Sequence, residues 1–588
     1  MTKHKKIFSG RDWQLLTHFA HYFKPHKKWL TISLISIPIT TGASVAFLYL
    51  MESIIDNYIV PGNADGLRWQ ALLLFVVLLI NIFFDGTYSY SFVKAGGLTI
   101  VDVRRKLFAK AIRFPSKYYD KNPIGITLSR LTSDMDAIAE SFATGILGLL
   151  ADSIKTLVLL IYLSYINWQL TLVLLLVVPV ILLVIRFLRK KMRKAYFIAR
   201  ASLAKSAAYL QESLNGMKTI QLYAAQEEVF NKYDKLNKEF CDAQNHSNVY
   251  DSTLYSIIDG ITSVATALVL GFGAYSIWGD SLSIGVLVVF ITSLERLFIP
   301  VRQFAQQVST IQRAFSSLEH VSELFDTEVE EEIQHDASPI VLQDIVFEHV
   351  SFCYNEDADD VLKDVSFKLK KGDRLALVGT TGSGKSTIIK LLSKSYTGYR
   401  GSIKINGIEL RDISIHQLRK AVSVMQQDIF MFNNSIEFNI ALGRKNITKE
   451  QVLEAAEFVY ANRFIEKLPE QYQYKVQDNG GNLSKGQAQL ISFARAIAGH
   501  SELIILDEAT SSVDSLTEQY IQNAIANIFA QKTVIAVAHR LSTIRNSSLI
   551  LVLDKGEVIE RGTHQELVNM SGKYATLVQK LVNSELEN

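Results

Sequence analysis

Apolar residues are distributed unevenly along the 588-residue chain. Long apolar runs are confined to roughly the first 306 residues, and the remainder alternates short apolar runs with charged segments. Six runs have a length near the ~20 residues that a helix needs to cross a hydrocarbon core of ~30 Å. They cover residues 29–50, 69–92, 143–165, 167–188, 253–278 and 282–306. The pattern predicts a multidomain protein in which an all-α domain of six transmembrane helices precedes a soluble α/β domain.

The same pattern sets the expected domain boundaries. Residues 1–28 hold apolar side chains at helical spacing before a Lys-Pro-His-Lys-Lys run, which predicts an amphipathic elbow helix on the cytoplasmic leaflet. The transmembrane domain is expected at residues 29–318, and an acidic linker at residues 319–340. The soluble domain is expected at residues 341–588.

Basic residues set the orientation of the predicted spans. They cluster before the first span, after the second and after the fourth, whereas the loop after the first span carries Glu52, Asp56 and Asp65. Because basic residues are retained in the cytoplasm, we expect the N-terminus, the long stretches 93–142 and 189–252, and the soluble domain on that side. The chain is therefore predicted to be a multi-pass protein of the cytoplasmic (inner) membrane.

A glycine-rich loop lies between a strand-like and a helix-like run of the soluble domain. It reads Gly379-Thr380-Thr381-Gly382-Ser383-Gly384-Lys385-Ser386-Thr387. The glycines allow backbone N–H groups to curl around an anion, and the following helix N-terminus adds a positive dipole end. We expect Lys385 to reach the β- and γ-phosphates of a nucleotide and the Ser386 hydroxyl to hold Mg²⁺. The loop predicts a P-loop nucleotide site.

A second stretch supplies two carboxylates. Residues 503–508, Leu-Ile-Ile-Leu-Asp-Glu, are typical of a buried parallel strand that ends in acids. We expect Asp507 to hold Mg²⁺ through water and Glu508 to polarise the attacking water. Together with the glycine-rich loop, this strand predicts hydrolysis of ATP with Mg²⁺.

These two motifs belong to an ordered set that resembles the ATP-binding cassette (ABC) family. Val424-Met-Gln-Gln-Asp428 is similar to the family's glutamine loop, and Asn482-Leu-Ser-Lys-Gly-Gln487 is similar to its signature. Residues 511–514 resemble the D-loop, and residues 538–542 resemble the switch region. The resemblance covers about 240 residues and implies a P-loop NTPase domain that follows a type I/IV exporter membrane domain.

The resemblance also implies roles for individual residues. Gln427 would contact the metal and the attacking water, with Gln426 as the alternative, and His539 would contact the γ-phosphate. Tyr354 would stack on adenine; otherwise it is a surface tyrosine. The D-loop residue is Asp514. The signature, which would contact ATP bound to the opposite subunit, comprises Leu483, Ser484, Lys485, Gly486 and Gln487.

Family membership implies a dimer that moves a compound through the membrane. Two halves are needed because each ATP lies between the glycine-rich loop of one half and the signature of the other. Residues 119–125 and 211–216 are similar to the coupling helices of exporters. The implied function is ATP-driven export of a small hydrophobic or amphipathic compound, of the multidrug type, by alternating access. A lipid flippase that works as a homodimer is the alternative.

The signature departs from the family pattern in a way that bears on the partner. Lys485 replaces the usual first glycine, and Asp478-Asn479 replaces the usual Glu-Arg pair. A lysine adds a long side chain beside a backbone that must approach the γ-phosphate, at a position where a positive φ would favour glycine. With Glu508 retained, the chain resembles the glutamate-bearing half of bacterial heterodimeric multidrug exporters. A different second half-transporter is therefore favoured over a homodimer.

Composition and motifs argue against several other classes of protein. The formal net charge of +3 argues against nucleic acid as a partner, and the six apolar runs exclude a soluble cassette that acts on ribosomes or DNA. A cassette-gated channel is disfavoured because Glu508 and His539 are both present. Cys241 and Cys353 lie far apart in segments expected in the cytoplasm, so a disulfide framework is not expected. Membrane lipid is the expected surrounding of the first domain.

Several ionisable residues fall at or inside the predicted spans. Charge in the bilayer interior is costly, so such side chains tend to face a cavity or a partner. These residues are candidates for lining the substrate path, although a water-filled vestibule or a shifted span boundary would also explain them. They are Asp85, Asp152, Lys155, Asp259, Glu295 and Arg296.

Overall fold

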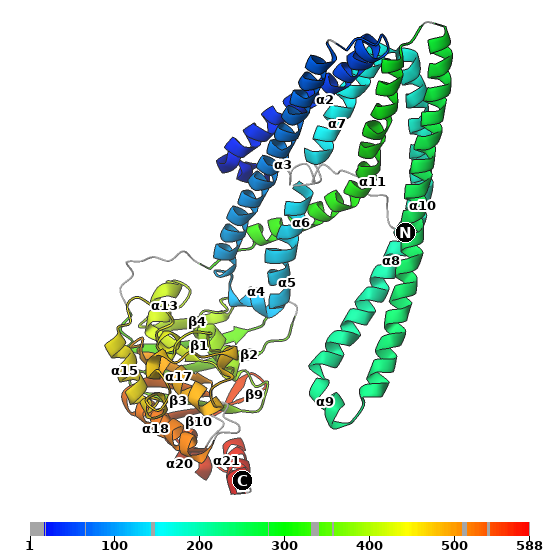
Figure 1. The fold of residues 1–588 in the computed structure, drawn as a ribbon. Coiled ribbons are helices and arrows are strands. Elements are labelled where there is room, and N and C mark those ends of the chain that lie inside the picture. The colour runs from blue at the N-terminus through cyan, green and yellow to red at the C-terminus, as the bar shows by residue number, and fades with distance from the viewer. Residues whose placement is uncertain are drawn as a thin grey trace. The chain divides into compact units, whose positions relative to one another are not determined.

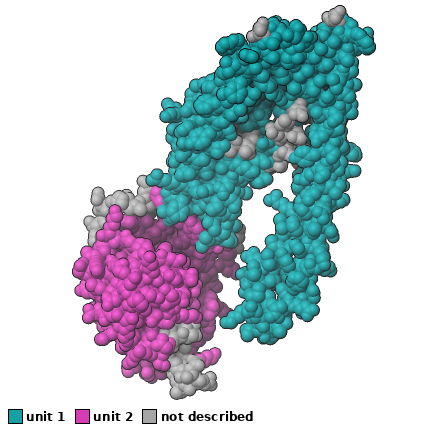
Figure 2. Space-filling view, viewed as in Figure 1, with its two compact units in different colours: residues 1–112, 123–327 teal, residues 113–122, 328–588 magenta. Residues whose placement is uncertain are grey.

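The computed structural model of the chain divides into two compact units. It describes residues 17, 19–64, 66–142, 147–279, 281–330, 340–355, 358–507, 514–537 and 541–586. Unit 1 comprises residues 1–112 and 123–327, and unit 2 comprises residues 113–122 and 328–588 (Figure 2).

Unit 1 is built from long helices (Figure 1). Five helices of the described part are long and apolar enough to cross a membrane. They are α2 (Lys27–Ile54), α3 (Leu67–Ala111), α7 (Leu147–Ile166), α8 (Trp168–Asn215) and α10 (Gln226–Trp278). The sixth predicted span lies in α11 (Ile284–Asp326), where several side chains between residues 295 and 309 fall outside the description. Polar extensions make α3, α8, α10 and α11 longer than the predicted spans.

The helices of unit 1 pack in antiparallel neighbours. Helices α8 and α10 run side by side, and α2 packs along α3. Only Asn167 separates α7 from α8, and its side-chain oxygen accepts a hydrogen bond from the Leu170 N–H at 2.9 Å. This N-cap satisfies one of the free donors at the start of α8 without a longer loop.

In the second predicted coupling segment, the helix break lies later than the sequence suggested. Residues 211–215 continue α8 to Asn215, and the separate short helix is α9 (Met217–Leu222). Gly216 lies at this break, because a glycine in a helix loses more conformational entropy than other residues do. In the first predicted coupling segment the helix likewise breaks, at Asn122 and Pro123, between α4 (Ser116–Lys121) and α5 (Ile124–Ser129).

Shorter helices complete unit 1. A 3₁₀ turn (His21–His26) leads into α2, and α6 (Met135–Glu140) follows α5. The rings of Phe19 and Phe23 are buried and lie 5.4 and 5.3 Å from the ring of Phe142. The first 16 residues and His18, which hold much of the predicted elbow helix, are outside the described residues.

The described part of unit 2 contains two β-sheets. The four-stranded sheet has the order β2 (Leu362–Lys370), β1 (Asp344–Phe352), β4 (Arg400–Ile405) and β5 (Ile408–Glu409), with antiparallel pairs. The six-stranded sheet has the order β10 (Glu557–Gly562), β9 (Leu549–Asp554), β3 (Arg374–Gly379), β8 (Thr533–Val537), β7 (Leu503–Asp507) and β6 (Val422–Met425). All its pairs are parallel except β10 with β9.

The parallel strands are buried on both faces, which explains their nearly continuous apolar sequences. In β3, Leu375 and Leu377 join one core, and Ala376 and Val378 join another. The other helices of unit 2 pack on the sheets or on one another. They are α12 (Lys385–Leu392), α13 (Ile415–Ala421), α14 (Ile436–Ala441), α15 (Lys449–Phe458), α16 (Asn462–Ile465), α17 (Lys485–Ile497), α18 (Ser515–Gln531), α19 (Leu541–Arg545), α20 (His564–Asn569) and α21 (Lys573–Leu586).

Gly401 at the start of β4 provides a test of this packing. Its φ is +87°, and an added Cβ would lie 2.3 Å from the carbonyl oxygen of His349. We expect Gly401→Ala to destabilise unit 2 by roughly 1–3 kcal/mol, which lowers the thermal unfolding midpoint of the full chain. Gly398→Ala is the control, because nothing lies within 4 Å of its added Cβ. Equal midpoints for the two variants would contradict the assigned backbone conformation.

Candidate nucleotide-binding site

The glycine-rich loop connects β3 to α12 at the carboxyl edge of the six-stranded sheet. Its backbone runs too close to neighbouring atoms for larger residues. A Cβ at Gly379 would lie 2.2 Å from the Leu553 carbonyl oxygen, and one at Gly384 would lie 2.6 Å from Cδ2 of Leu362. Gly384 also has a φ of +102°, which side chains disfavour. The glycines are therefore required for the loop conformation itself.

Lys385 lies across this loop at the start of α12. Its Nζ donates to the carbonyl oxygens of Gly379 at 2.8 Å and Thr380 at 3.0 Å. Burial lowers the pKa of Lys385, and the nearby Asp507 carboxylate opposes that shift. The buried side chain places a cation at the glycine-rich loop, where it can attract an anion.

Ser383 adds a second feature that fits a phosphate. The residue is 2% exposed, and its Oγ has no hydrogen-bond partner among the described residues. Buried polar atoms without partners are rare, and a bound ligand is one explanation for them. A hydroxyl of this kind can donate a hydrogen bond to a phosphate oxygen, so the loop fits a nucleoside triphosphate.

The predicted metal-binding residues share one edge of the sheet. Ser386 is exposed in the first turn of α12, Asp507 ends β7, and Gln427 follows β6, which pairs with β7. Hydroxyl, carboxylate and amide oxygens suit Mg²⁺, which usually takes few protein ligands together with substrate phosphates. The described residues contain no group of three or more His, Cys, Asp or Glu that could hold a metal alone. The donor set therefore fits Mg²⁺ bound together with a nucleotide.

Tyr354 packs beside the loop. Its ring meets Phe352 and Tyr396 edge-on, with ring centres 5.0 and 5.1 Å away. Its hydroxyl lies 3.1 Å from Oγ1 of Thr387, the last residue of the loop motif. The structure thus brings Tyr354, the predicted adenine contact, next to the phosphate loop. A hydrogen bond between the Tyr354 and Thr387 hydroxyl groups connects the two.

Asp120 of α4 extends this cluster, and the sequence did not indicate its role. Its carboxylate accepts hydrogen bonds from the Tyr396 hydroxyl at 2.7 Å and the Lys390 Nζ at 3.2 Å. The Tyr396 hydrogen bond is the largest cause of the lowered pKa of Asp120, and Lys390 adds to it. Lys390 lies on α12 and 5.4 Å from the centre of the Tyr354 ring. The α4 segment is therefore bound to the helix that begins in the loop.

The signature forms the start of α17. Ser484 is the N-cap: its Oγ accepts from the Gln487 N–H at 3.2 Å, and the Gln487 side chain accepts from the Ser484 N–H at 3.0 Å. This capping box leaves the Ser484 hydroxyl hydrogen free to donate to a phosphate. Leu483 is half-buried against the core and Gly486 is buried, so Ser484 and Lys485 are the exposed residues here.

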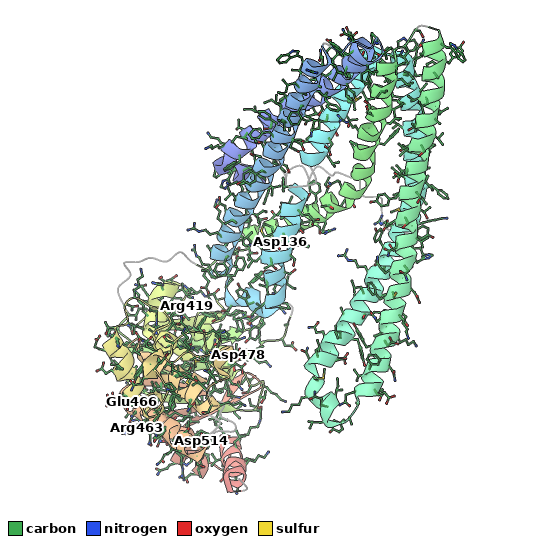
Figure 3. All side chains as sticks on the ribbon, in the orientation of Figure 1. Asp136, Arg419, Arg463, Glu466, Asp478 and Asp514 are labelled. Atoms are coloured by element: carbon green, nitrogen blue, oxygen red, sulfur yellow. The ribbon has the colours of Figure 1, made fainter. Side chains whose placement is uncertain are left out.

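The expectation of a positive φ at Lys485 is wrong. Lys485 is the first residue of α17 and is not among the residues with positive φ. Ser484 is the N-cap, so the helix already begins at Lys485. Position 485 therefore takes a helical conformation that any side chain can adopt. The positive φ values occur upstream, at Asp478, Asn479 and Gly480; Figure 3 shows Asp478.

The remaining predicted residues lie at strand and helix ends. Asp514 is the N-cap of α18 and accepts a hydrogen bond from the Thr517 N–H at 2.9 Å, which lowers the pKa of Asp514 (Figure 3). Glu508 and His539 are outside the described residues. The strands that precede them, β7 and β8, are adjacent in the sheet and end at Asp507 and Val537.

Comparisons with known proteins agree with this architecture. Residues 30–301 match the ABC transporter transmembrane region, and residues 362–511 match the ABC transporter domain. The ATP-dependent lipid A-core flippase of Chromobacterium violaceum is 30% identical over 570 residues, 96% of this chain and 97% of that protein. The chain belongs to the ABC exporter family.

Two further similarities describe this exporter. A Bacillus subtilis protein, YgaD, whose name refers to multidrug export, is 28% identical over 575 residues, 96% of this chain and 98% of that protein. The structure of a bacterial Atm1-family ABC exporter with ATP bound has a TM-score of 0.77 and 25% identity, and the match covers 94% of this chain and 98% of that one. Both matches span the membrane and nucleotide-binding parts together.

Several sequence predictions are thereby confirmed. The chain has the ABC exporter fold, a helical transmembrane domain followed by an α/β nucleotide-binding domain. It is a multi-pass inner-membrane protein with a cytoplasmic nucleotide-binding domain, and it binds ATP and couples ATP hydrolysis to transport. Exporters of this family act as dimers.

The contacts of Asp120 predict a measurable effect on nucleotide use. Asp120→Asn keeps the shape but removes the charge that holds Lys390 beside Tyr354. We expect the KM for ATP to rise by about two- to fivefold, since partly exposed ion pairs contribute up to ~1 kcal/mol. Steady-state ATP hydrolysis by the purified exporter gives this value.

Asp136→Asn is the matched control for this change. Asp136 also forms a partly exposed ion pair, with Arg104 at 2.8 Å, but in unit 1 (Figure 3). If both variants change the KM for ATP equally, the Asp120 cluster has no specific link to the nucleotide site.

Proposed function

We propose that this chain is one half of a dimeric exporter that uses ATP to move an amphipathic or hydrophobic compound out of the cytoplasm. The observation that supports this proposal best is the phosphate loop, where glycine backbone, Lys385 and the unpartnered Ser383 hydroxyl converge. The phosphate loop belongs to the same chain as a membrane domain, which supports coupling of ATP hydrolysis to transport.

Each part of the site has a proposed task. The backbone from Gly379 to Gly384 and the Lys385 ammonium bind the β- and γ-phosphates. Ser386, Gln427 and Asp507 hold Mg²⁺, which supplies charge neutralisation at the phosphates when it is bound. Tyr354 stacks on the adenine ring, as its position beside Thr387 supports.

Hydrolysis requires a base and a group that contacts the γ-phosphate. Glu508 accepts a proton from the attacking water, and His539 contacts the γ-phosphate. Both follow strands that end at the same sheet edge as Asp507. The Ser484 hydroxyl and the N-terminus of α17 contact the ATP of the opposite half, because a helix N-terminus favours an anion.

The names of two relatives support the proposed substrate class. One is named for multidrug export and another for lipid A-core transport, so drug efflux is proposed, with a lipid flippase working as a homodimer as the second candidate. The compounds transported in both cases are amphipathic. Movement of a labelled lipid between the leaflets of proteoliposomes, without efflux of drugs, would favour the flippase.

The proposed base predicts the phenotype of Glu508→Gln. The glutamine keeps the shape of the site but cannot take a proton, so ATP binding is preserved and turnover falls by at least ~100-fold. Binding of a fluorescent ATP analogue and phosphate release measure the two properties. Lys385→Ala is the control, because it removes the cation of the loop and weakens binding itself. Hydrolysis near the wild-type rate in Glu508→Gln would exclude this role.

We further propose that the second half is a different chain. Lys485 places a long, exposed side chain in the first turn of α17, beside the Ser484 hydroxyl that meets the partner's ATP. The ATP site that receives this signature would mainly bind nucleotide. The site formed by this chain's loop and an unaltered partner signature would hydrolyse it.

Expression of the chain alone tests the heterodimer. We expect little substrate-stimulated hydrolysis without a second half-transporter, and recovery when a chain with an unaltered signature is co-expressed. Size-exclusion chromatography with light scattering reports the oligomeric state. A stable homodimer with full stimulated turnover, together with no effect of Lys485→Gly, would refute the heterodimer.

A further inference from the structure

Four of the ionisable residues in the predicted spans meet in one cavity of unit 1. The cavity has a volume of about 320 Å³ and lies among α2, α3, α7 and α11. Its charged lining consists of Asp85, Asp152, Lys155 and Arg296. Asp259 does not line it, and the side chain of Glu295 is outside the described residues. The volume lies within the usual range for small-molecule sites.

Two of the four charges neutralise each other. The Lys155 Nζ lies 2.7 Å from an Asp85 carboxylate oxygen, an ion pair between α7 and α3. This pair satisfies one positive and one negative charge inside the membrane domain. Lys155 also lies close enough to attract Asp152, but its single charge faces two carboxylates, and Arg296 has no ion-pair partner among the described residues.

Arg296 approaches an aromatic ring rather than an acid. Its guanidinium carbon lies 5.2 Å from the centre of the Phe47 ring. This contact provides a cation–π interaction, but it leaves the planar N–H donors of the guanidinium available to an anion. Asp152 is partly buried and lies one helical turn before Lys155 on α7. The cavity therefore presents one cation without an acidic partner among the described residues, Arg296, and one carboxylate charge more than Lys155 can balance.

The rest of the lining is divided between polar and apolar side chains. Asn81 donates a hydrogen bond to the Ser44 hydroxyl at 3.1 Å, which links α3 and α2 on the cavity wall. Val45, Leu48 and Leu159 contribute apolar surface. An apolar wall beside two separated opposite charges suits an alkyl or aromatic group attached to a polar head.

We infer that this cavity recognises the headgroup of a zwitterionic amphiphile, with Arg296 contacting its anionic group and Asp152 contacting its cationic group. The inference rests on the proposed export function and names a substrate class for it. Charges that are not fully balanced are costly in a membrane domain, and a ligand that carries both charges would compensate both at once. A purely cationic or anionic compound compensates only one.

The test uses amphiphiles that share one alkyl chain and differ in headgroup: phosphocholine, trimethylammonium, sulfate and maltoside. The full exporter dimer is reconstituted in liposomes of phosphatidylglycerol, so that the added probe is the only zwitterion. ATP hydrolysis is measured against probe concentration. We expect the phosphocholine probe to stimulate hydrolysis at the lowest concentration.

Single substitutions then separate the two ends of the headgroup. Arg296→Gln should raise the half-saturating concentration of the phosphocholine and sulfate probes about tenfold and leave the trimethylammonium probe unchanged, since a charge-assisted hydrogen bond is lost. Asp152→Asn should affect the phosphocholine and trimethylammonium probes and leave the sulfate probe unchanged. Arg296→Lys, which keeps the charge, should restore part of the affinity. Lys94→Gln is the control, because Lys94 lies over Trp29 and does not line the cavity.

The outcomes distinguish the inference from the proposed function. Stimulation of the wild type by the trimethylammonium or maltoside probe alone, or equal effects of both substitutions on all probes, would overturn the zwitterion site and leave export standing. No stimulation by any probe would overturn both. A second set of liposomes with phosphatidylcholine identifies the source: raised hydrolysis without probe assigns the headgroup to a membrane lipid, and an unchanged rate assigns it to a free compound.

Discussion

The close approach of the backbone around the phosphate loop constrains the whole nucleotide-binding domain. Gly379 lies so close to the Leu553 carbonyl oxygen, and Gly384 so close to the Leu362 side chain, that neither position has room for a Cβ. Those atoms belong to β9 and β2, which lie in different sheets, so both sheets must hold their positions for the loop to form. A core that takes apolar side chains from both sheets fixes them there. The chemistry at the loop therefore depends on apolar packing remote from any phosphate.

The membrane domain must reconcile charge with a low-dielectric surrounding. An ion pair between α3 and α7 reduces that cost, since each charge replaces part of the water that the other loses. Charges that such pairs do not fully balance still attract an incoming group of opposite charge. The same residues thus separate into those that hold helices together and those that remain available for recognition.

The sequence predicted elements well and contacts poorly. Strands β3, β7 and β8 and the loop after β3 were predictable, because apolar runs and glycine spacing are local signals. The Asp120 cluster was not, since its hydrogen bonds join residues 270 and 276 positions apart. The helical conformation of Lys485 could have been predicted, because Ser484 and Gln487 have the spacing of a capping box. The choice of which membrane charges share a cavity required helix packing.

The single-residue connection at Asn167 has a mechanical consequence. A loop of several residues would absorb relative movement of the helices that it joins, whereas one capped residue cannot. Any tilt of α7 is therefore passed to the start of α8, and α8 carries it over 48 residues to its cytoplasmic end. Helices α7 and α8 therefore move together about their connection at the outer face of the membrane. Because α8 is long, a small rotation at Asn167 displaces the cytoplasmic end of α8 by a large distance.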